Sequence, residues 1–338
     1  MSNSIKNRIK KVIGQRVINN IKSHPSIIIN YFNDMVLYYK HSTVFFQNTP
    51  NKLECQIILD YHSVEKGLLF ENTRYRFARE RILSLHKNLK HDFIISRSHH
   101  SQIEVAYKVM CKYYELHQKN NIDIEDFFTP EQYGFYKEVL SFRYDSKFNG
   151  VISHKKSDFY KNTENNFFQF SNSRKSIRSF TGELVPITVI EEAVSLATNT
   201  PSVCNRQASK VYLVNDKESV DSILMIQGGL SGYTENINQL LVLTTDRNYF
   251  YTIGERNQFY IDGGMFLMNL LYALHYKKIA NCPANWGKTK KEEEKIYDFV
   301  SIPRSEKIIC IIPIGIAKDE FRVTLSKRRC LSEVMVSL

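Results

Sequence analysis

Three short clusters of cationic, hydroxyl and amide side chains have the composition of a binding site for a phosphorylated ligand. The first cluster runs Arg174-Lys175-Ser176-Ile177-Arg178-Ser179-Phe180. In an extended backbone alternate side chains share a side, so Arg174, Ser176 and Arg178 would face a ligand while Ile177 enters the core. Fixed cations of this kind neutralise a phosphate. Taken alone, such a run is more often a solvated surface strand.

The second cluster is Pro201-Ser202-Val203-Cys204-Asn205-Arg206-Gln207, and the third is Lys327-Arg328-Arg329. In the second cluster, Pro and Asn indicate a tight turn. Amide side chains carry both donors and acceptors, so Asn205 and Gln207 could bind the edge of a planar heterocycle. By itself this pattern is more often an ordinary helix-to-strand turn. The third cluster is a second source of cations for a phosphate.

Together the clusters offer cations, hydroxyl groups and amides, which are the partners that the phosphate, the ribityl chain and the ring of flavin mononucleotide (FMN) require. No metal site is expected. The six cysteines are widely spaced and form no C-x-x-C pair, which argues against zinc and against a disulfide framework. This cysteine usage fits a reducing, cytoplasmic environment.

The elements that must position these clusters form an α+β pattern after about residue 166. A capping box from Thr188 to Glu191 predicts a helix to about Ala197. Short β-branched runs predict strands at Lys210–Val214 and Leu240–Thr245, and a longer apolar run predicts a buried strand at Ile308–Ile316. Gln258–Tyr276 is a long apolar helix by the same reasoning. We therefore expect a mixed, mostly antiparallel sheet flanked by helices.

The preceding part of the chain is expected to be mainly helical. Between residues 50 and 145, Leu53, Ile57, Tyr61 and Val64 share one helix face, and Gly67 is a plausible C-cap. Further helical patterns cover Arg76–Leu89 and Gln102–Gln118. The polar stretch Asn149–Asn166 is typical of a linker. The expected division is an N-terminal segment 1–45, a helical extension and linker 46–165, and a flavin-binding domain 166–338.

The N-terminal segment contains a basic amphipathic pattern from Ser4 to Ser23, which His24 and Pro25 are expected to end. Its apolar stripe consists of Ile5, Ile9, Val12, Ile13, Val17 and Ile21, with six cations and no acid around it. A helix of this kind gains from contact with an anionic membrane surface. Packing of the stripe on the helical extension or on a dimer mate is an equally good interpretation, and the two stay open.

The ordered set of motifs resembles the nitroreductase family of FMN-dependent oxidoreductases. The family's opening R-R-S-x-R-x-F is met by Arg174 to Phe180, with Lys175 in place of the second Arg. Its turn P-S-x-x-N-x-Q-P is met by Pro201, Ser202, Asn205 and Gln207, with Ala208 in place of the last Pro.

Two later motifs extend the resemblance to about residues 170–335. The family's helix D-x-G-x-x-x-x-N-L-x-L-A is matched by Asp262, Gly264, Asn269, Leu270 and Ala273. The glycine-rich segment after it corresponds to Lys278–Gly287, where Lys-Ile-Ala replaces the usual Gly-Leu-Gly. The loss of these glycines could change the path of the backbone beside the flavin.

The resemblance implies a homodimer with two FMN sites, each built from both chains. It implies that Arg174 and Arg328 neutralise the phosphate and that a backbone N–H near Pro283, Ala284 or Asn285 contacts the flavin N5. No catalytic acid or nucleophile is obligatory, because the flavin carries the electrons. NAD(P)H and a small organic acceptor would use the same face in turn, in a ping-pong scheme.

Other interpretations remain beside this one. The chain could be an accessory partner, with or without flavin, of a membrane-associated biosynthetic complex. His62 and Glu65 lie at i, i+3 on one helix face and could form a general-base pair, but a helix end with Gly67 as its cap is the favoured interpretation. The segment also resembles one found in nitroreductase-like proteins of surface-polysaccharide genes, which suggests a glycan-related substrate. The net charge of +11 permits nucleic-acid binding, but no recognition motif supports it. No run approaches the ~20 apolar residues that cross a bilayer.

Further residues near the proposed ring site invite a functional interpretation. Cys204 and Cys282 could be redox thiols, but small buried hydrophobic side chains are the favoured interpretation. Tyr249, Phe250 and Tyr251 could form a lid over the flavin, or could equally pack on their own domain.

Overall fold

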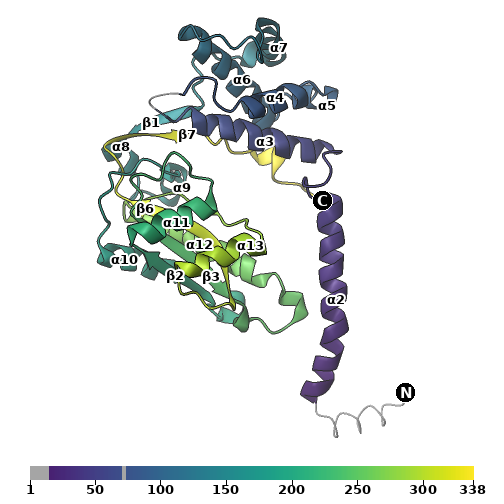
Figure 1. The fold of residues 1–338 in the computed structure, drawn as a ribbon, viewed down its shortest axis with the longest axis vertical. Coiled ribbons are helices and arrows are strands. Elements are labelled where there is room, and N and C mark those ends of the chain that lie inside the picture. Colours follow the sequence, from purple (N-terminus) through teal and green to yellow (C-terminus); the bar gives the residue numbers. More distant parts are fainter. Residues whose placement is uncertain (1–14, 71–73) are drawn as a thin grey trace. The chain divides into compact units, whose positions relative to one another are not determined.

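The computed structural model describes residues 15–70 and 74–338, with side chains from residue 24 onward. The chain forms two compact units (Figure 1). The helical unit comprises the described residues up to Val151 together with Leu325–Leu338, and the sheet unit comprises Ile152–Thr324. The sequence instead placed the domain boundary at 166 and kept the C-terminal segment with the flavin-binding domain.

The helical unit is built around a core between its helices. Its helices are α2 (Gln15–His41), α3 (Pro50–Gly67), α4 (Arg79–Asn88), α5 (Asp92–Ile95), α6 (Ser101–Lys119) and α7 (Pro130–Leu140), with short 3₁₀ turns at Ser141–Arg143 and Leu331–Glu333. The predicted face of α3 is buried, since Leu53, Ile57, Tyr61 and Val64 are each at most 5% exposed. The mainly helical character of this part is confirmed.

Two predicted helix ends in this unit are wrong. Helix α2 continues through Pro25 to His41, because a proline removes one backbone hydrogen bond without forbidding helix on either side. Gly67 is the last residue of α3 and not a left-handed cap, since Leu68 is the cap in a right-handed conformation. A Cβ at Gly67 would lie 2.2 Å from the Phe77 ring, so close packing explains this glycine. The predicted stripe of Ser4–Ser23 lies outside the residues whose side chains are described.

The sheet unit contains the predicted antiparallel sheet. Its strands are β2 (Ser209–Val214), β3 (Gln239–Asp246), β4 (Ala280–Asn281), β5 (Ala284–Asn285) and β6 (Glu306–Gly315), in the order β2-β3-β6-β4 with β5 also paired to β6. All these pairs are antiparallel. Strands β1 (Val151–Lys155) and β7 (Glu320–Thr324) form a separate two-stranded sheet.

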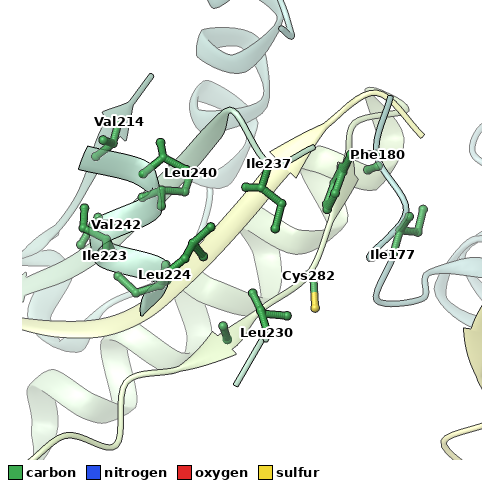
Figure 2. Close-up of a cluster of buried hydrophobic side chains, with 14 of the residues drawn as sticks. Ile177, Phe180, Val214, Ile223, Leu224, Leu230, Ile237, Leu240, Val242 and Cys282 are labelled. Atoms are coloured by element: carbon green, nitrogen blue, oxygen red, sulfur yellow. The ribbon is translucent and has the colours of Figure 1, made fainter. Parts of the chain in front are cut away.

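Helices cover both faces of the larger sheet. Helices α10 (Ile187–Ala197) and α12 (Gln258–Tyr276) pack on the face that includes Leu241 and Ile312. On the other face, α11 (Lys217–Gln227) packs with the cluster drawn in Figure 2, which contains Leu240 and Val242. Because successive strand residues point to opposite faces, a sheet covered on both sides needs continuous apolar strands, as β3 and β6 have.

The remaining helices of this unit are α8 (Lys156–Tyr160), α9 (Phe167–Ser173) and α13 (Lys290–Glu293), with 3₁₀ turns at Val203–Asn205, Arg247–Tyr249, Ile253–Glu255 and Glu294–Asp298. Strand β1 and helix α8 therefore occupy the stretch that was predicted to be a linker. The predicted capping box is also wrong, because α10 begins at Ile187 after Pro186 and has no side-chain cap. Thr188 thus lies inside the first turn. Within the described part of the chain, no helix combines the length and apolar character needed to span a membrane.

Candidate functional site

The Arg174 cluster is an extended segment held along the edge of the sheet. The Ile177 N–H donates to the Asn281 carbonyl at 2.9 Å, and the Thr181 N–H donates to the Ile316 carbonyl at 2.9 Å. As predicted, Ile177 is buried, at 2% exposure, whereas Arg174, Ser176 and Arg178 are half-buried. The segment therefore lies beside the residues that follow α12, so the structure brings two of the predicted site elements together.

The surroundings of this segment are cationic. Burial, together with the nearby charges of Arg174 and Lys175, lowers the pKa of His275 to about 4. His275 Nε2 lies 2.7 Å from the Ser173 hydroxyl. His275 is therefore neutral at pH 7, and it contacts the residue before the cationic segment without adding to the charge of that segment.

Arg178 has the least satisfied guanidinium of the cluster. Its Nε and Nη1 atoms are buried and have no hydrogen-bond partner among the described residues. Burial raises the pKa of the Tyr233 phenol to about 12, while the charges of Arg178 and Arg322 act in the opposite direction. Buried charged donors normally have partners. The two nitrogen atoms of Arg178 therefore mark a place for an acceptor that the described chain does not supply.

The segment after α12 runs antiparallel along β6. The Cys282 N–H donates to the Pro313 carbonyl at 3.1 Å, and Ala284 pairs with Ile311. Hydrogen-bonded and non-hydrogen-bonded pairs alternate in an antiparallel ladder, so the Ala284 N–H points towards β6 and the Asn285 N–H points away from it. Pro283 has no N–H to donate. Of the three predicted residues, Asn285 alone combines a free-facing N–H with an exposed side chain.

The Pro201 cluster is a strained turn. Three of its non-glycine residues have a left-handed backbone, with φ of 49° at Cys204, 54° at Asn205 and 50° at Gln207. Each such residue costs about 1–2 kcal/mol, and residues of this kind concentrate at functional sites. The Ser202 hydroxyl accepts a hydrogen bond from the Gln207 N–H at 2.9 Å, and the Asn205 side-chain oxygen accepts one from Gln207 Nε2 at 3.0 Å.

Two acidic residues hold this turn from outside the cluster. Asp262 on α12 accepts from the Val203 N–H at 3.2 Å. Glu255 binds both terminal nitrogens of Arg206, at 3.0 and 2.7 Å. Arg206 also lies over the rings of Phe250 and Tyr251, with its guanidinium carbon 5.1 and 5.5 Å from their centroids. The predicted aromatic lid residues are thus tied to the turn by Arg206.

Sequence reasoning missed Arg206, Glu255 and Tyr233. Arg206 and Glu255 are 49 residues apart, so no local pattern could pair them. Asp262 was found as part of a motif, but its role as acceptor for the turn was not.

The Arg174 cluster and the strained turn lie at opposite ends of the same sheet. The strand after the turn reaches β6 near Lys307, because Ser209 pairs with Thr245 and Thr245 with Lys307. Asn281, beside the Arg174 cluster, pairs with Ile314. At ~3.3 Å per residue these places on β6 are roughly 20 Å apart. The cavity beside the turn has about 100 Å³, which is below the ~300 Å³ at which small-molecule sites begin.

The third cluster belongs to the helical unit. Arg329 forms an ion pair with Glu54 at 2.7 Å and a longer one with Glu333 at 3.5 Å. The Lys327 carbonyl accepts from Gln102 Nε2 at 2.9 Å, and the Arg328 guanidinium donates to the Ser326 carbonyl at 3.3 Å. Both side chains are exposed, but Arg329 is engaged by carboxylates of its own unit, whereas Arg328 contacts a backbone carbonyl.

The structure gives the positions of the remaining residues for which the sequence left two interpretations open. Cys282 is 1% exposed and packs in the cluster of Figure 2, which confirms its interpretation as a buried hydrophobic residue. Cys204 is exposed at the strained turn, so the prediction of a buried hydrophobic side chain is wrong for this residue. On α3, His62 Nδ1 lies 3.1 Å from the fully buried carboxylate of Glu65. Among the described residues no group of three or more histidine, cysteine or acidic side chains could hold a metal ion.

The sheet unit thus defines an α+β domain with a cationic edge segment and a strained amide turn. Residues 172–227 match the nitroreductase family. This range contains both the Arg174 and the Pro201 clusters, and it confirms the resemblance that the motifs predicted. No curated protein sequence matches the chain.

Several solved structures resemble about half of the chain. A protein assigned as an NAD(P)H:FMN oxidoreductase from Staphylococcus epidermidis is 19% identical over 52% of this chain and 96% of its own, with a TM-score of 0.45. A protein assigned as a nitroreductase, in complex with FMN, from Desulfovibrio desulfuricans is 18% identical over 52% and 98%, with a TM-score of 0.43. A nitroreductase-like protein from Streptococcus mutans is 19% identical over 52% and 98%, with a TM-score of 0.43.

Proposed function

We propose that this protein is an FMN-dependent oxidoreductase that takes electrons from NAD(P)H and reduces a small organic acceptor. The match of residues 172–227 to the nitroreductase family supports oxidoreductase chemistry. Three parts of the proposal go beyond that match: the cofactor, the nicotinamide donor and the alternation of the two substrates on one face.

The observation that carries the proposal is the unsatisfied guanidinium of Arg178. Two of its nitrogen atoms are buried without a hydrogen-bond partner among the described residues. A buried donor without an acceptor costs about 1–3 kcal/mol, and more when it is charged. An anionic or carbonyl-bearing ligand beside Arg178 would remove that cost. The phosphate and the ring carbonyls of FMN are acceptors of this kind, so the residues present fit the cofactor.

The predicted residues of the edge segment and Asn285 would have distinct roles in the proposed site. Arg174, Lys175 and Arg178 would supply positive charge, and Ser176 would bind the ribityl chain. The Asn285 N–H and side chain would bind the central edge of the ring. When bound, FMN supplies hydride transfer at its N5 atom. The protein's own contribution is orientation, charge and exclusion of water.

The second half of the site would come from a partner chain. The strained turn with Pro201, Ser202, Asn205 and Gln207 lies roughly 20 Å along the sheet from the Arg174 cluster of its own chain. In a two-fold dimer the turn of one chain can approach the cationic segment of the other. Lys327, Arg328 and Arg329 would add cations, with Arg328 the best candidate because Arg329 is already paired with Glu54.

An exposed apolar stripe on α12 supports the dimer. It consists of Ile261, Met265, Met268, Tyr272 and Tyr276, four of which are between 38% and 55% exposed. The spacing of three and four residues places these side chains on one face. An apolar face of this kind on a helix that also packs on the sheet is typical of permanent interfaces.

The dimer is tested by light scattering on Met268→Glu and on Met225→Glu. The second variant is the matched control, because Met225 is 78% exposed on α11 and outside the stripe. We expect Met268→Glu to give monomers that lose flavin and Met225→Glu to remain dimeric. A wild-type monomer that retains flavin would contradict the proposal.

The function is tested on the purified wild-type chain. We expect a flavin absorbance spectrum, release of FMN on denaturation, and oxidation of NADH or NADPH when a quinone or nitroaromatic acceptor is present. A colourless protein that binds no added FMN would rule out the enzyme and favour a flavin-free accessory role.

A further inference from the structure

The described C-terminal half of α2 exposes an extensive apolar surface. Ten of its apolar side chains are each between 42% and 71% exposed: Ile27, Ile28, Ile29, Tyr31, Phe32, Met35, Val36, Leu37, Tyr38 and Tyr39. At the C-terminal end of this helix, Lys52 Nζ donates to the Lys40 carbonyl at 2.8 Å and the rings of Tyr39 and Phe45 are 4.7 Å apart. A surface of this size on a helix requires a partner.

The apolar surface is wider than one neighbouring helix needs. At ~100° per residue, every member except Leu37 lies within an arc of about 200°. The polar residues Asn30, Asn33 and Lys40 fall in the remaining arc. A helix that packs on the core of a globular protein buries a stripe of about 100°. A continuous apolar medium would cover the wider arc.

The net charge of residues 1–41 indicates which apolar medium covers the helix. Residues 1–41 contain seven Lys and Arg and a single acid, Asp34. Their net charge of +6 is more than half of the +11 of the whole chain. Each cation close to an anionic lipid surface gains about 1 kcal/mol, whereas two such segments repel one another. The same charge therefore favours lipid and disfavours a second copy of this helix.

We propose that α2 lies in the headgroup region of an anionic lipid membrane, parallel to its surface, and attaches the protein there. The three tyrosine side chains Tyr31, Tyr38 and Tyr39 suit this depth, because amphipathic rings concentrate at the boundary between headgroups and hydrocarbon. Low charge on the apolar arc and cations close by in the sequence are the pattern of interfacial helices. This inference is independent of the flavin and would hold for a protein without it.

The test is co-sedimentation of the full-length protein with vesicles of phosphatidylcholine, with and without phosphatidylglycerol. We expect binding to the anionic vesicles that weakens as salt is added, because salt screens the cations. Ile28→Asp and Asn33→Asp form a matched pair. They add equivalent negative charge one and a half turns apart, and only Ile28 lies near the centre of the apolar arc. Both side chains are exposed, so both variants keep the fold.

The difference between the two variants is the decisive result. We expect Ile28→Asp to bind anionic vesicles at least ~10-fold more weakly than Asn33→Asp, a ratio that corresponds to about 1.4 kcal/mol. Equal weakening by the two would mean that charge alone acts and would overturn the proposal. Absence of wild-type binding at low salt would overturn it as well. If Ile28→Asp instead reduced the size of the particle in light scattering, the face would be an interface between two copies.

Discussion

Arg178 in the sheet unit and Arg329 in the helical unit were both predicted to supply positive charge to a phosphate, but their surroundings in the structure differ. Arg329 pairs with Glu54 at 2.7 Å, and Glu54 is buried. Arg178 has two buried nitrogen atoms without a partner among the described residues. Both guanidinium groups are charged at every physiological pH. The proposal that Arg178 binds a ligand, whereas Arg329 has a structural role, therefore rests on the carboxylate that the chain places beside Arg329.

The comparison predicts a large loss of flavin on removal of Arg178. Hydrogen bonds to charged groups are worth about 1.5–3 kcal/mol each, so Arg178→Ala should weaken FMN binding by about 3 kcal/mol, or more than 100-fold. Arg174→Ala should cost about half as much. Titration of the apoprotein with FMN, followed by flavin fluorescence, measures both. Affinity within threefold of wild type for Arg178→Ala would remove the main support for the site.

Acid should destabilise both units through buried histidines, of which His275 and His86 have the largest lowering of pKa. Burial lowers the pKa of His275 in the sheet unit to about 4, helped by Arg174 and Lys175, and lowers that of His86 in the helical unit to about 4, helped by Lys90. The unfolded chain has a histidine pKa near ~6.5 and so binds the proton first as the pH falls. The stability each site provides is complete above that pH and is lost between about 6.5 and 4, amounting to about 2 kcal/mol per histidine at pH 5.

Urea denaturation at pH 7 and pH 5 measures this effect. His275→Gln and His86→Gln should each reduce the difference between the two pH values by about 2 kcal/mol, because glutamine does not titrate. Equal pH dependence in the wild type and both variants would show that other groups control acid unfolding.

Loss of Arg329 should affect stability and not flavin. Arg329→Ala leaves the buried carboxylate of Glu54 without its ion pair, and an unpaired buried acceptor costs about 1–3 kcal/mol. We expect a lower urea midpoint and FMN affinity close to that of wild type. Arg329→Lys keeps the charge and should recover part of the stability. Strong loss of FMN with unchanged stability would mean that Arg329 and Arg178 are alike after all.

The elements with regular apolar patterns could be predicted from the sequence. Gln258–Tyr276 was expected as a helix and is one, and the strands at β2, β3 and β6 fell within a few residues of their predicted positions. These elements can be recognised in the sequence because burial on both sides of the sheet requires long apolar runs. The buried Ile177 between half-buried neighbours was also visible in the sequence, since alternation is a local property of extended backbone.

The partners of the site residues could not be predicted, because they are distant in the chain. Glu54 lies 275 positions from Arg329, and Glu255 lies 49 from Arg206. The capping box at Thr188 failed for a different reason. Its residue pattern is common, and here the helix already begins at Ile187, directly after Pro186. The helical unit was inferred mainly from helical periodicity, and the family match, which covers residues 172–227, does not extend to it.

The smallest expected effect separates strain from function at the Pro201 turn. Cys204 and Asn205 both have a left-handed backbone, with φ of 49° and 54°, and glycine adopts this conformation without the Cβ penalty. Relief of about 1–2 kcal/mol of strain is partly offset by the greater freedom of glycine in the unfolded chain. We therefore expect Cys204→Gly to stabilise the protein by about 0.5–1 kcal/mol and to leave FMN affinity unchanged. Asn205→Gly should gain less, because asparagine tolerates this conformation better. It should also weaken FMN binding through loss of its amide.

Denaturation midpoints and FMN titrations measure the stability and the FMN affinity of each variant. The decisive result is the difference between the two variants in both quantities. If both variants bind FMN as tightly as wild type, the turn contributes no side chain to the flavin, and its strain has another origin.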